Sequence, residues 1–378
     1  MTMQFRDLHA QYEALKPEID AGIAGVIDSA AFILGKPVGE LEQQLAAYAG
    51  REHCVCVANG TEALQLSLMA MDVGRGDAVF TSDFTYFASA GCASILGATP
   101  VLADIDLATF NISPAALEAA IEKTLSEGKL RPRVIIPVDL FGLPADYPAI
   151  EKIAQKYGLV ILEDAAQGFG GRIGARRACS FGDISATSFF PAKPLGCYGD
   201  GGAIFTDDAA VAARLRSLRA SGKSPEDKYD NREVGMNSRL DTLQAAILLP
   251  KLRAFADYEL DAVNAAAARY TAALKDAVVT PTVPEGYLSS WAQYTVLLED
   301  GAQRAEVQRR LKEKGIPTMV YYPRGLHQQA AYAGMALRDE DYPNTLEATR
   351  RVLSLPIHPY LQKDDQDLVI ESLLEVLG

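Results

Sequence analysis

The chain has 378 residues, of which 49% are hydrophobic, and its 36 Lys and Arg against 49 Asp and Glu give a net charge of −13. The length and composition predict a globular protein made of one large and one smaller part. The excess of negative charge argues against binding to nucleic acid or to an anionic membrane surface.

No segment has the pattern of a signal peptide or of a membrane span. The cysteines are odd in number and lack the spacing of a metal site, so we expect buried thiols in a reducing compartment and no bound metal. They are Cys54, Cys56, Cys92, Cys179 and Cys197. The protein is therefore expected to be soluble and cytoplasmic.

Residues 1–50 are expected to form an N-terminal arm and two helices, which separate near residues 32–37. From there to about residue 208, short apolar runs alternate with longer amphipathic segments, which predicts a mainly parallel sheet covered by helices on both faces. Seven runs are predicted strands: 54–58, 78–81, 100–105, 134–138, 159–162, 184–189 and 203–206. Helices are expected between several of them, at 61–71, 114–125 and 148–157.

The pattern changes after about residue 240. Residues 243–273 form a long Ala- and Leu-rich helical stretch that Pro250 should kink or divide. Beyond it we expect strands at 293–298 and 318–322, a helix at 302–314 and a helical tail. The predicted fold is a large α/β domain over residues 1–255, with a seven-stranded sheet and the N-terminal arm, and a small α+β domain over residues 256–378.

A lysine follows the end of one predicted strand in a Gly-rich turn. Ser188 ends the strand, and Lys193 comes five residues later. Ligands bind at the carboxyl ends of parallel strands, where a lysine can form a Schiff base with a carbonyl compound. Taken alone, a solvated surface lysine is the commoner interpretation.

Two other strand ends supply matching groups. Asp164 follows the apolar strand at 159–162, and a carboxylate there either holds a heteroaromatic nitrogen protonated or simply caps a helix. Gly60 and Thr61 begin a helix whose first amides can bind an anion, although Thr61 could be an ordinary N-cap. An anion site, an acid and Ser-x-x-x-x-Lys together are the parts of a pyridoxal phosphate enzyme.

Longer motifs resemble the DegT/DnrJ/EryC1/StrS family of sugar aminotransferases, which have the fold-type I architecture. EDAAQ begins at Glu163, SFFPAKPLGCYGDGG at Ser188 and GMNSRLDTLQAAIL at Gly235, and the likeness extends from Phe5 to Tyr360. The resemblance implies a pyridoxal 5'-phosphate enzyme that moves an amino group from glutamate to a nucleotide-linked keto-sugar. It also implies a homodimer whose active site is shared between the subunits.

The resemblance assigns roles to individual residues around the cofactor ring. Lys193 would hold the cofactor as a Schiff base and then shuttle a proton. Asp164 would pair with the pyridine nitrogen, and Gln167 would lie against the ring. Tyr86 would stack on the ring, whereas without the family it would be interpreted as a core aromatic side chain.

The resemblance assigns a second group of residues to the cofactor phosphate. Gly60, Thr61 and Ser188 would bind it within one subunit. Asn237, in the motif that begins at Gly235, would reach the phosphate of the neighbouring subunit.

Two features favour a particular substrate. The Gly-Asp-Gly-Gly sequence from Gly199 resembles members that act on 3-keto sugars, whereas those acting on 4-keto sugars more often have Gly-Glu-Gly-Gly. The motifs together are most similar to members that aminate UDP-2-acetamido-2-deoxy-3-oxo-D-glucuronate for O-antigen. Arg239 and Arg324 are the guanidinium groups expected to receive its carboxylate and diphosphate, with Tyr322 and His327 near the sugar.

Departures from the family's pattern leave the substrate open. A histidine often stands where this chain has Tyr321, and the common Pro-Val-His ends in Asp139 here. A 4-keto-sugar aminotransferase and a non-catalytic regulatory protein on the same fold remain alternatives. Lys193 argues against a related dehydratase, which usually has histidine there, and no G-x-G-x-x-G follows the first strand as a nicotinamide dehydrogenase requires.

Overall fold

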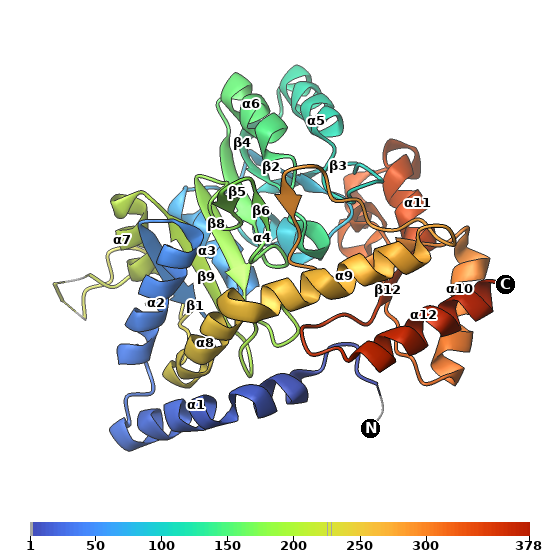
Figure 1. Ribbon diagram of the computed structural model, residues 1–378. Helices are drawn as coiled ribbons and strands as arrows, with labels where there is room; N and C mark the ends of the chain where they lie inside the picture. Colours follow the sequence, from blue (N-terminus) through green and yellow to red (C-terminus); the bar gives the residue numbers. More distant parts are fainter. Residues whose placement is uncertain (1–2, 225, 228) are drawn as a thin grey trace.

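Seven strands form one sheet in the order β1-β9-β8-β5-β4-β2-β3 (Figure 1). The computed structural model describes residues 3–224, 226–227 and 229–378. β9 runs antiparallel to the other six strands, which are parallel to one another, so the predicted seven-stranded, mainly parallel sheet is confirmed. The strands are β1 His53–Val57, β2 Asp77–Ser82, β3 Thr99–Ala103, β4 Arg131–Ile136, β5 Val160–Asp164, β8 Ile184–Ser188 and β9 Gly202–Thr206.

Helices cover both faces of this sheet because successive side chains of each strand enter different cores. Val79 and Phe80, neighbours in β2, lie in two separate apolar clusters. The Phe80 cluster is covered by α2 Lys36–Ala49, α5 Pro114–Glu127, α6 Tyr147–Tyr157 and α8 Thr242–Ala254. The Val79 cluster is covered by α3 Gly60–Ala70, α4 Ala88–Ile95 and α7 Ala209–Leu218. A strand buried on both faces explains the continuous apolar runs in the sequence.

The long helical stretch is divided, but not at Pro250. That proline lies inside α8, and the division is a π-helical turn at Phe255–Glu259, followed by α9 Leu260–Leu274. The carboxylate of Glu259 accepts hydrogen bonds from Gln11 of α1 Leu8–Ser29 and from the hydroxyl of Tyr360. The π-helical turn is therefore in contact with segments that are distant in the sequence. One of them is α1, which lies alongside α8 in Figure 1.

The C-terminal part has its own core. Val263, Tyr294, Leu311 and Leu373 are buried together there. Its strands β11 Tyr294–Leu297 and β12 Val352–Leu355 pair antiparallel, and α10 Gly301–Glu313, α11 Pro343–Arg351 and α12 Lys363–Leu377 pack around them. The division of the chain near residue 255 stays a prediction.

One predicted strand in this part is wrong. Residues 318–322 make only an isolated bridge between Met319 and Ser354. Pro317 and Pro323 flank the segment, and proline has no amide hydrogen with which to extend a ladder. The strand that does pair with β11 is β12, which the sequence did not predict.

The remaining elements are short. A three-stranded sheet contains β10 Tyr287–Leu288, β6 Arg172–Ile173 and β7 Arg176–Arg177. Turns of 3-10 helix lie at Leu140–Gly142, Leu326–Gln328, Ala330–Met335 and Asp339–Asp341. All five cysteines are buried with free thiols, as predicted. Within the described residues, no helix combines the length and the apolar character that a membrane span requires.

Candidate active site

The carboxyl ends of β5 and β8 and the amino end of α3 border a cavity of about 710 Å³. This is the edge of a parallel sheet at which ligands bind. The structure brings eight of the residues singled out from the sequence to its wall, although they come from distant parts of the chain. They are Gly60, Thr61, Tyr86, Asp164, Gln167, Ser188, Lys193 and Tyr322.

Lys193 lies in a tight turn that directly follows β8. Its backbone N–H donates to the carbonyl of Phe190 at 2.8 Å, and the N–H of Cys197 donates back to Phe189 at 2.8 Å. Burial is the main cause that lowers the pKa of Lys193 to about 8; the charge of Asp164 opposes the shift, and the charge of Arg6 adds to it. The lowered pKa makes more of the neutral amine available near physiological pH than an ordinary lysine would offer, and the neutral amine is the nucleophile that Schiff-base chemistry needs.

Asp164 ends β5 and is buried at the cavity wall. Its Oδ2 accepts a hydrogen bond of 2.7 Å from the hydroxyl of Ser89, and its Oδ1 accepts one of 3.1 Å from the N–H of Ala166. Burial raises the pKa of Asp164, and these two hydrogen bonds and the charge of Lys193 oppose the rise. A buried, oriented carboxyl group of this kind fits a protonated heteroaromatic nitrogen.

The amino end of α3 meets the end of β8. Asn59, and not Thr61, is the N-cap, because its Oδ1 accepts the N–H of Glu62 at 2.8 Å. The amides of Gly60 and Thr61 therefore keep no acceptor within the helix. A Cβ atom on Gly60 would lie 2.6 Å from the Cβ of Ser188 and 3.2 Å from its Oγ. Helix amides and a hydroxyl thus converge on one point, as a phosphate seat requires.

Gln167 and Tyr322 also line the cavity. The side-chain amide of Gln167 donates to the hydroxyl of Tyr322 at 3.1 Å, and its Oε1 accepts the N–H of Phe141 at 2.7 Å. These bonds fix the amide plane at the wall. Tyr86, which is 58% exposed, reaches the same cavity from the loop after β2.

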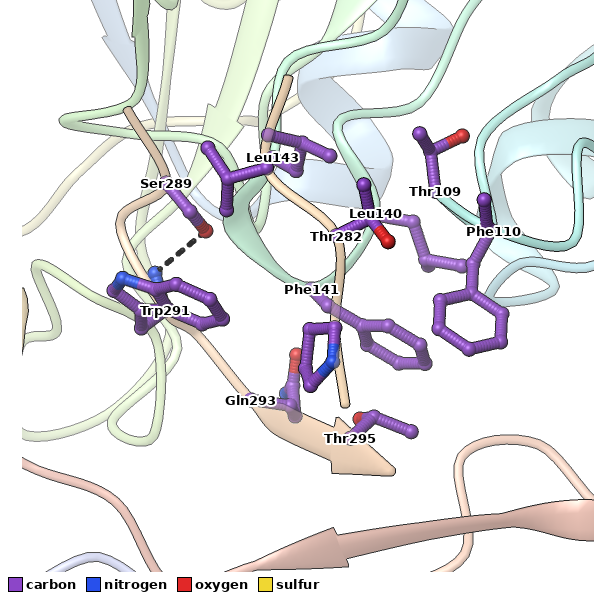
Figure 2. A pocket seen from close by; sticks show the side chains of 13 residues that line it. Thr109, Phe110, Leu140, Phe141, Leu143, Thr282, Ser289, Trp291, Gln293 and Thr295 are labelled. Atoms are coloured by element: carbon purple, nitrogen blue, oxygen red, sulfur yellow. Dashed lines mark hydrogen bonds between the residues drawn. The ribbon is translucent and has the colours of Figure 1, made fainter. Parts of the chain in front are cut away.

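Sequence reasoning missed two polar residues here. Ser89 orients Asp164, and Gln293 lines both this cavity and a second one of about 20 Å³ (Figure 2). Figure 2 shows Gln293 just before β11, beside Phe141. It also shows Trp291, whose backbone N–H donates to the hydroxyl of Ser289 at 3.1 Å. Gln293 stands inside a predicted strand, and neither its type nor its spacing singled it out.

Four other predicted site residues do not line the cavity. Asn237 and Arg239 lie on the exposed or partly exposed segment before α8. Arg324 is exposed and lines a separate pocket with other arginines. His327 is buried, with its Nδ1 2.6 Å from Asp83 and its Nε2 3.0 Å from Asp339.

The cavity groups fit pyridoxal phosphate. A low-pKa amine, a buried carboxyl group, an anion seat and an aromatic side chain match its aldehyde, ring nitrogen, phosphate and ring face. The amine follows the carboxyl end of β8, and the anion seat lies between that same strand end and the amino end of α3. The position of β8 in the sheet therefore fixes both.

Comparison with known proteins agrees with this fit. The model of the DegT/DnrJ/EryC1/StrS aminotransferase family matches residues 13–374. The chain is 45% identical over 372 residues to the UDP-2-acetamido-2-deoxy-3-oxo-D-glucuronate aminotransferase of Pseudomonas aeruginosa, covering 98% of this chain and 99% of that protein. It is 42% identical over 380 residues to a pleiotropic regulatory protein of Geobacillus stearothermophilus, covering 99% and 98%.

A solved structure is similar over the whole length. The crystal structure of a DegT DnrJ EryC1 StrS aminotransferase from Brucella abortus has a TM-score of 0.96 and 46% sequence identity, and all of each chain is covered. The chain described here therefore belongs to the DegT/DnrJ/EryC1/StrS aminotransferase family and is a pyridoxal phosphate-dependent aminotransferase.

Proposed function

We propose that this protein transfers the amino group of glutamate to C-3 of a UDP-linked 3-keto sugar such as UDP-2-acetamido-2-deoxy-3-oxo-D-glucuronate. The single observation that carries the transamination is that Lys193, Asp164 and the anion seat at Gly60 face one cavity. The choice of sugar rests on the Pseudomonas aeruginosa relative, which is similar over nearly its whole length.

Each side chain at the cavity has a distinct task in this reaction. Pyridoxal phosphate, when bound, supplies an electron-accepting ring that stabilises charge at the carbon from which a proton leaves. The amine of Lys193 binds the cofactor, and its Nζ then takes the proton from Cα of glutamate. Asp164 holds the ring nitrogen, and the amides of Gly60 and Thr61 bind the phosphate.

The second half of the reaction uses the same groups in reverse. Lys193 returns a proton to the carbon of the former ketone, so that the sugar leaves as an amine and glutamate has become 2-oxoglutarate. Tyr86 stacks on the cofactor ring, and Ser188 holds the phosphate in place during both halves. Tyr322, fixed by Gln167, lies where it can contact the sugar.

A homodimer completes the site in this proposal. Among the described residues that line the cavity, Lys193 is the sole cation, against Glu62, Asp164 and Asp200. A substrate with a carboxylate and a diphosphate needs further cations. Arg239 is absent from its own chain's cavity wall, so we assign it, with Asn237, to the cavity of the partner subunit.

The surface between α1 and α2 supports this assembly. Ile27, Phe32, Ile33 and Leu34 are each at least 43% exposed there. A group of large apolar side chains on the surface is typical of an interface, and a two-fold interface would bury the same group on both copies.

We assign different roles to the two remaining predicted substrate residues, Arg324 and His327. Arg324 shares its pocket with Arg304 and Arg350, and we keep this basic pocket as the position for the diphosphate. His327 is held between Asp83 and Asp339, so we assign it a structural role instead. The five free cysteines favour a reducing compartment, and we place the reaction in the cytoplasm, as a step toward O-antigen or another surface polysaccharide.

Turnover of matched substrates tests the reaction. The full-length protein is incubated with pyridoxal phosphate, glutamate and UDP- or dTDP-linked 3-keto and 4-keto sugars, and the position of the new amine is read by NMR. We expect amination of the UDP-linked 3-keto sugar and none by Lys193→Ala. Turnover of 4-keto sugars alone would overturn the substrate. Absence of any turnover would favour a non-catalytic regulatory protein on the same fold. The Geobacillus stearothermophilus relative is named as a regulatory protein.

Mixing two inactive variants tests the shared site. Lys193→Ala lacks the amine, and Arg239→Ala lacks the residue assigned to the partner. In a random mixture, half of the dimers contain both chains and one intact site each, so about a quarter of wild-type activity should return. No return of activity would contradict the exchange of Arg239 between subunits.

A further inference from the structure

Arg6 contacts the turn that carries Lys193. It is partly buried in the N-terminal arm, just before α1, and its Nη2 donates to the carbonyl of Pro194 at 3.3 Å. Pro194 is bonded to Lys193 in the chain, so the guanidinium holds the turn through a residue that does not line the cavity. The sequence did not single out this residue, because one arginine in an amphipathic arm is ordinary.

The surroundings of Arg6 contain both basic and acidic groups. Glu259 is the carboxylate that acts on its charge, and the charge of Arg6 acts in turn on the amines of Lys251 and Lys193. Burial lowers the pKa of His358 to about 4, with Arg6 adding to the shift and Asp7 opposing it, so the His358 ring is neutral at physiological pH. The Glu259 carboxylate is also shared with Gln11 at 2.8 and 3.1 Å and with the hydroxyl of Tyr360 at 2.7 Å. The positive charge of Arg6 is therefore only partly offset.

Lys251 is a second buried amine on which the charge of Arg6 acts. The amine of Lys251 is buried without a hydrogen-bond partner in the described part of the chain, and lies 4.7 Å from the ring centre of Tyr198. Burial lowers the pKa of Lys251 to about 8; the charge of Glu259 opposes the shift and that of Arg6 adds to it. Burial lowers the pKa of Arg6 only to about 10, which leaves it charged at neutral pH.

We propose that Arg6 is a positioning residue for Lys193: its guanidinium fixes the Lys193–Pro194 turn, and its permanent charge disfavours a second positive charge on the Lys193 amine. The proposal rests on the role of Lys193 in the proposed function. Asp164, at the cavity side, is the opposing group, since its carboxylate favours the charged amine. The charges of Arg6 and Asp164 thus act on the Lys193 amine with opposite sign.

The amine of Lys193 can be measured without the reaction. The full-length chain is freed of cofactor and labelled briefly with acetic anhydride from pH 6 to pH 10, and mass spectrometry of the Lys193 peptide gives the labelling rate. For the wild type we expect a profile that reports a pKa of about 8. In Arg6→Gln, labelling at pH 7 should fall about threefold or more because less of the amine is neutral.

Two variants separate charge from structure. Arg6→Lys keeps a cation and should restore the wild-type profile. Arg253→Gln removes an exposed arginine that pairs with Glu18 of α1, and should leave the profile unchanged. A purely structural role of Arg6 would change the labelling rate equally at every pH. An unshifted profile in Arg6→Gln, or the same shift in Arg253→Gln, would overturn the proposal.

A second pair of variants tests the same opposition of charges. Asp164→Asn removes the carboxylate that favours the charged amine, so labelling of Lys193 at pH 7 should rise, and adding Arg6→Gln to it should lower the rate again. An equal rate in Asp164→Asn with and without Arg6→Gln would contradict the proposal. Borohydride trapping of pyridoxal phosphate on Lys193 is a separate measurement. If no pyridoxal phosphate is trapped on Lys193, the proposed function is wrong. The labelling profile tests the role of Arg6 independently of that result.

Discussion

The hydroxyl of Ser89 donates a 2.7 Å hydrogen bond to Oδ2 of Asp164, and both side chains are buried. Ser89 lies in the first turn of α4, on the loop-helix segment that also carries Tyr86. Because the N–H of Ala166 takes the other carboxylate oxygen, the carboxylate is held in one orientation. Ser89 also stabilises the ionised form, and so opposes the rise that burial imposes on the pKa of Asp164.

Ser89→Ala is expected to weaken catalysis without unfolding the protein. A hydrogen bond to a charged group contributes about 1.5–3 kcal/mol, which corresponds to a loss of about tenfold or more in kcat/KM. The loss should be largest at low pH, because the pKa of Asp164 rises further without the donor. Stopped-flow absorbance of the glutamate half-reaction between pH 6 and pH 9 measures this.

Ser94→Ala is the matched control for this prediction. Ser94 lies on the same helix, and its hydroxyl contacts the carbonyl of Ala90 and the hydroxyl of Tyr332, away from the cavity wall. It should leave kcat/KM unchanged. An equal loss in the two variants would show that Ser89 acts through helix stability alone.

The sheet was predictable because its strands are buried on both faces. β2 is buried at every position and β9 likewise, and such strands read as continuous apolar runs between turn residues. Lys193, Asp164 and Thr61 were found for the same reason, since each polar residue stands where an apolar run ends. Residues at strand ends of one sheet share an edge, whatever their distance in sequence.

What the sequence did not reveal depends on contacts between distant segments. The π-helical turn at Phe255–Glu259 coincides with hydrogen bonds from Gln11 and Tyr360, which no local pattern encodes. Val352–Leu355 has only four residues and precedes Pro356, so its pairing with β11 was not evident. The roles of Ser89 and Arg6 were not predicted, because each acts on a partner that is distant in the sequence.

Gly60→Ala is expected to disrupt the anion seat. The new methyl group would lie 2.6 Å from the Cβ of Ser188, so α3 or β8 must move. Overpacking of this kind costs about 1–3 kcal/mol, and the shift would separate the helix amides from the Ser188 hydroxyl. We expect the Kd for pyridoxal phosphate to rise about tenfold or more, measured by fluorescence titration. Gly39→Ala in α2 meets nothing within 4 Å and should leave the Kd unchanged.

His327 should stabilise the protein more at low pH than at high pH. Burial lowers the pKa of His327, but the hydrogen bond and charge of Asp83, together with those of Asp339, outweigh it and raise the pKa above the usual 6.5. The stabilisation is therefore complete below that usual value, and is lost as pH rises through the raised one. In urea unfolding, His327→Gln is expected to cost about 1.5–3 kcal/mol at pH 6, the range for a hydrogen bond to a charged group, and less at pH 9.

The exposed His9 provides the control for this pH dependence. Its side chain is 72% exposed and 3.9 Å from Glu13, so His9→Gln should change the free energy of unfolding little at either pH. A cost of His327→Gln that is the same at pH 6 and pH 9 would mean that the neutral ring, by packing against Tyr342, provides the whole effect.

Lys251→Met is expected to stabilise the protein at neutral pH. The wild-type amine is fully buried and unpartnered among the described residues, and burial lowers its pKa from 10.5 to about 8. Keeping it protonated at pH 7 therefore costs about 3 kcal/mol. Between pH 8 and 10.5 the unfolded chain binds the proton and the folded one does not, so the stability contributed by this site rises with pH. Methionine fills a similar volume without the charge and removes that rise. Urea unfolding of Lys251→Met should show a gain in the free energy of unfolding at pH 7 and a smaller gain at pH 10.

Lys275→Met is the control, because Lys275 is exposed, and it should show neither gain. A loss of stability of Lys251→Met at pH 7 would mean that the ammonium contact with the Tyr198 ring outweighs the cost of burial.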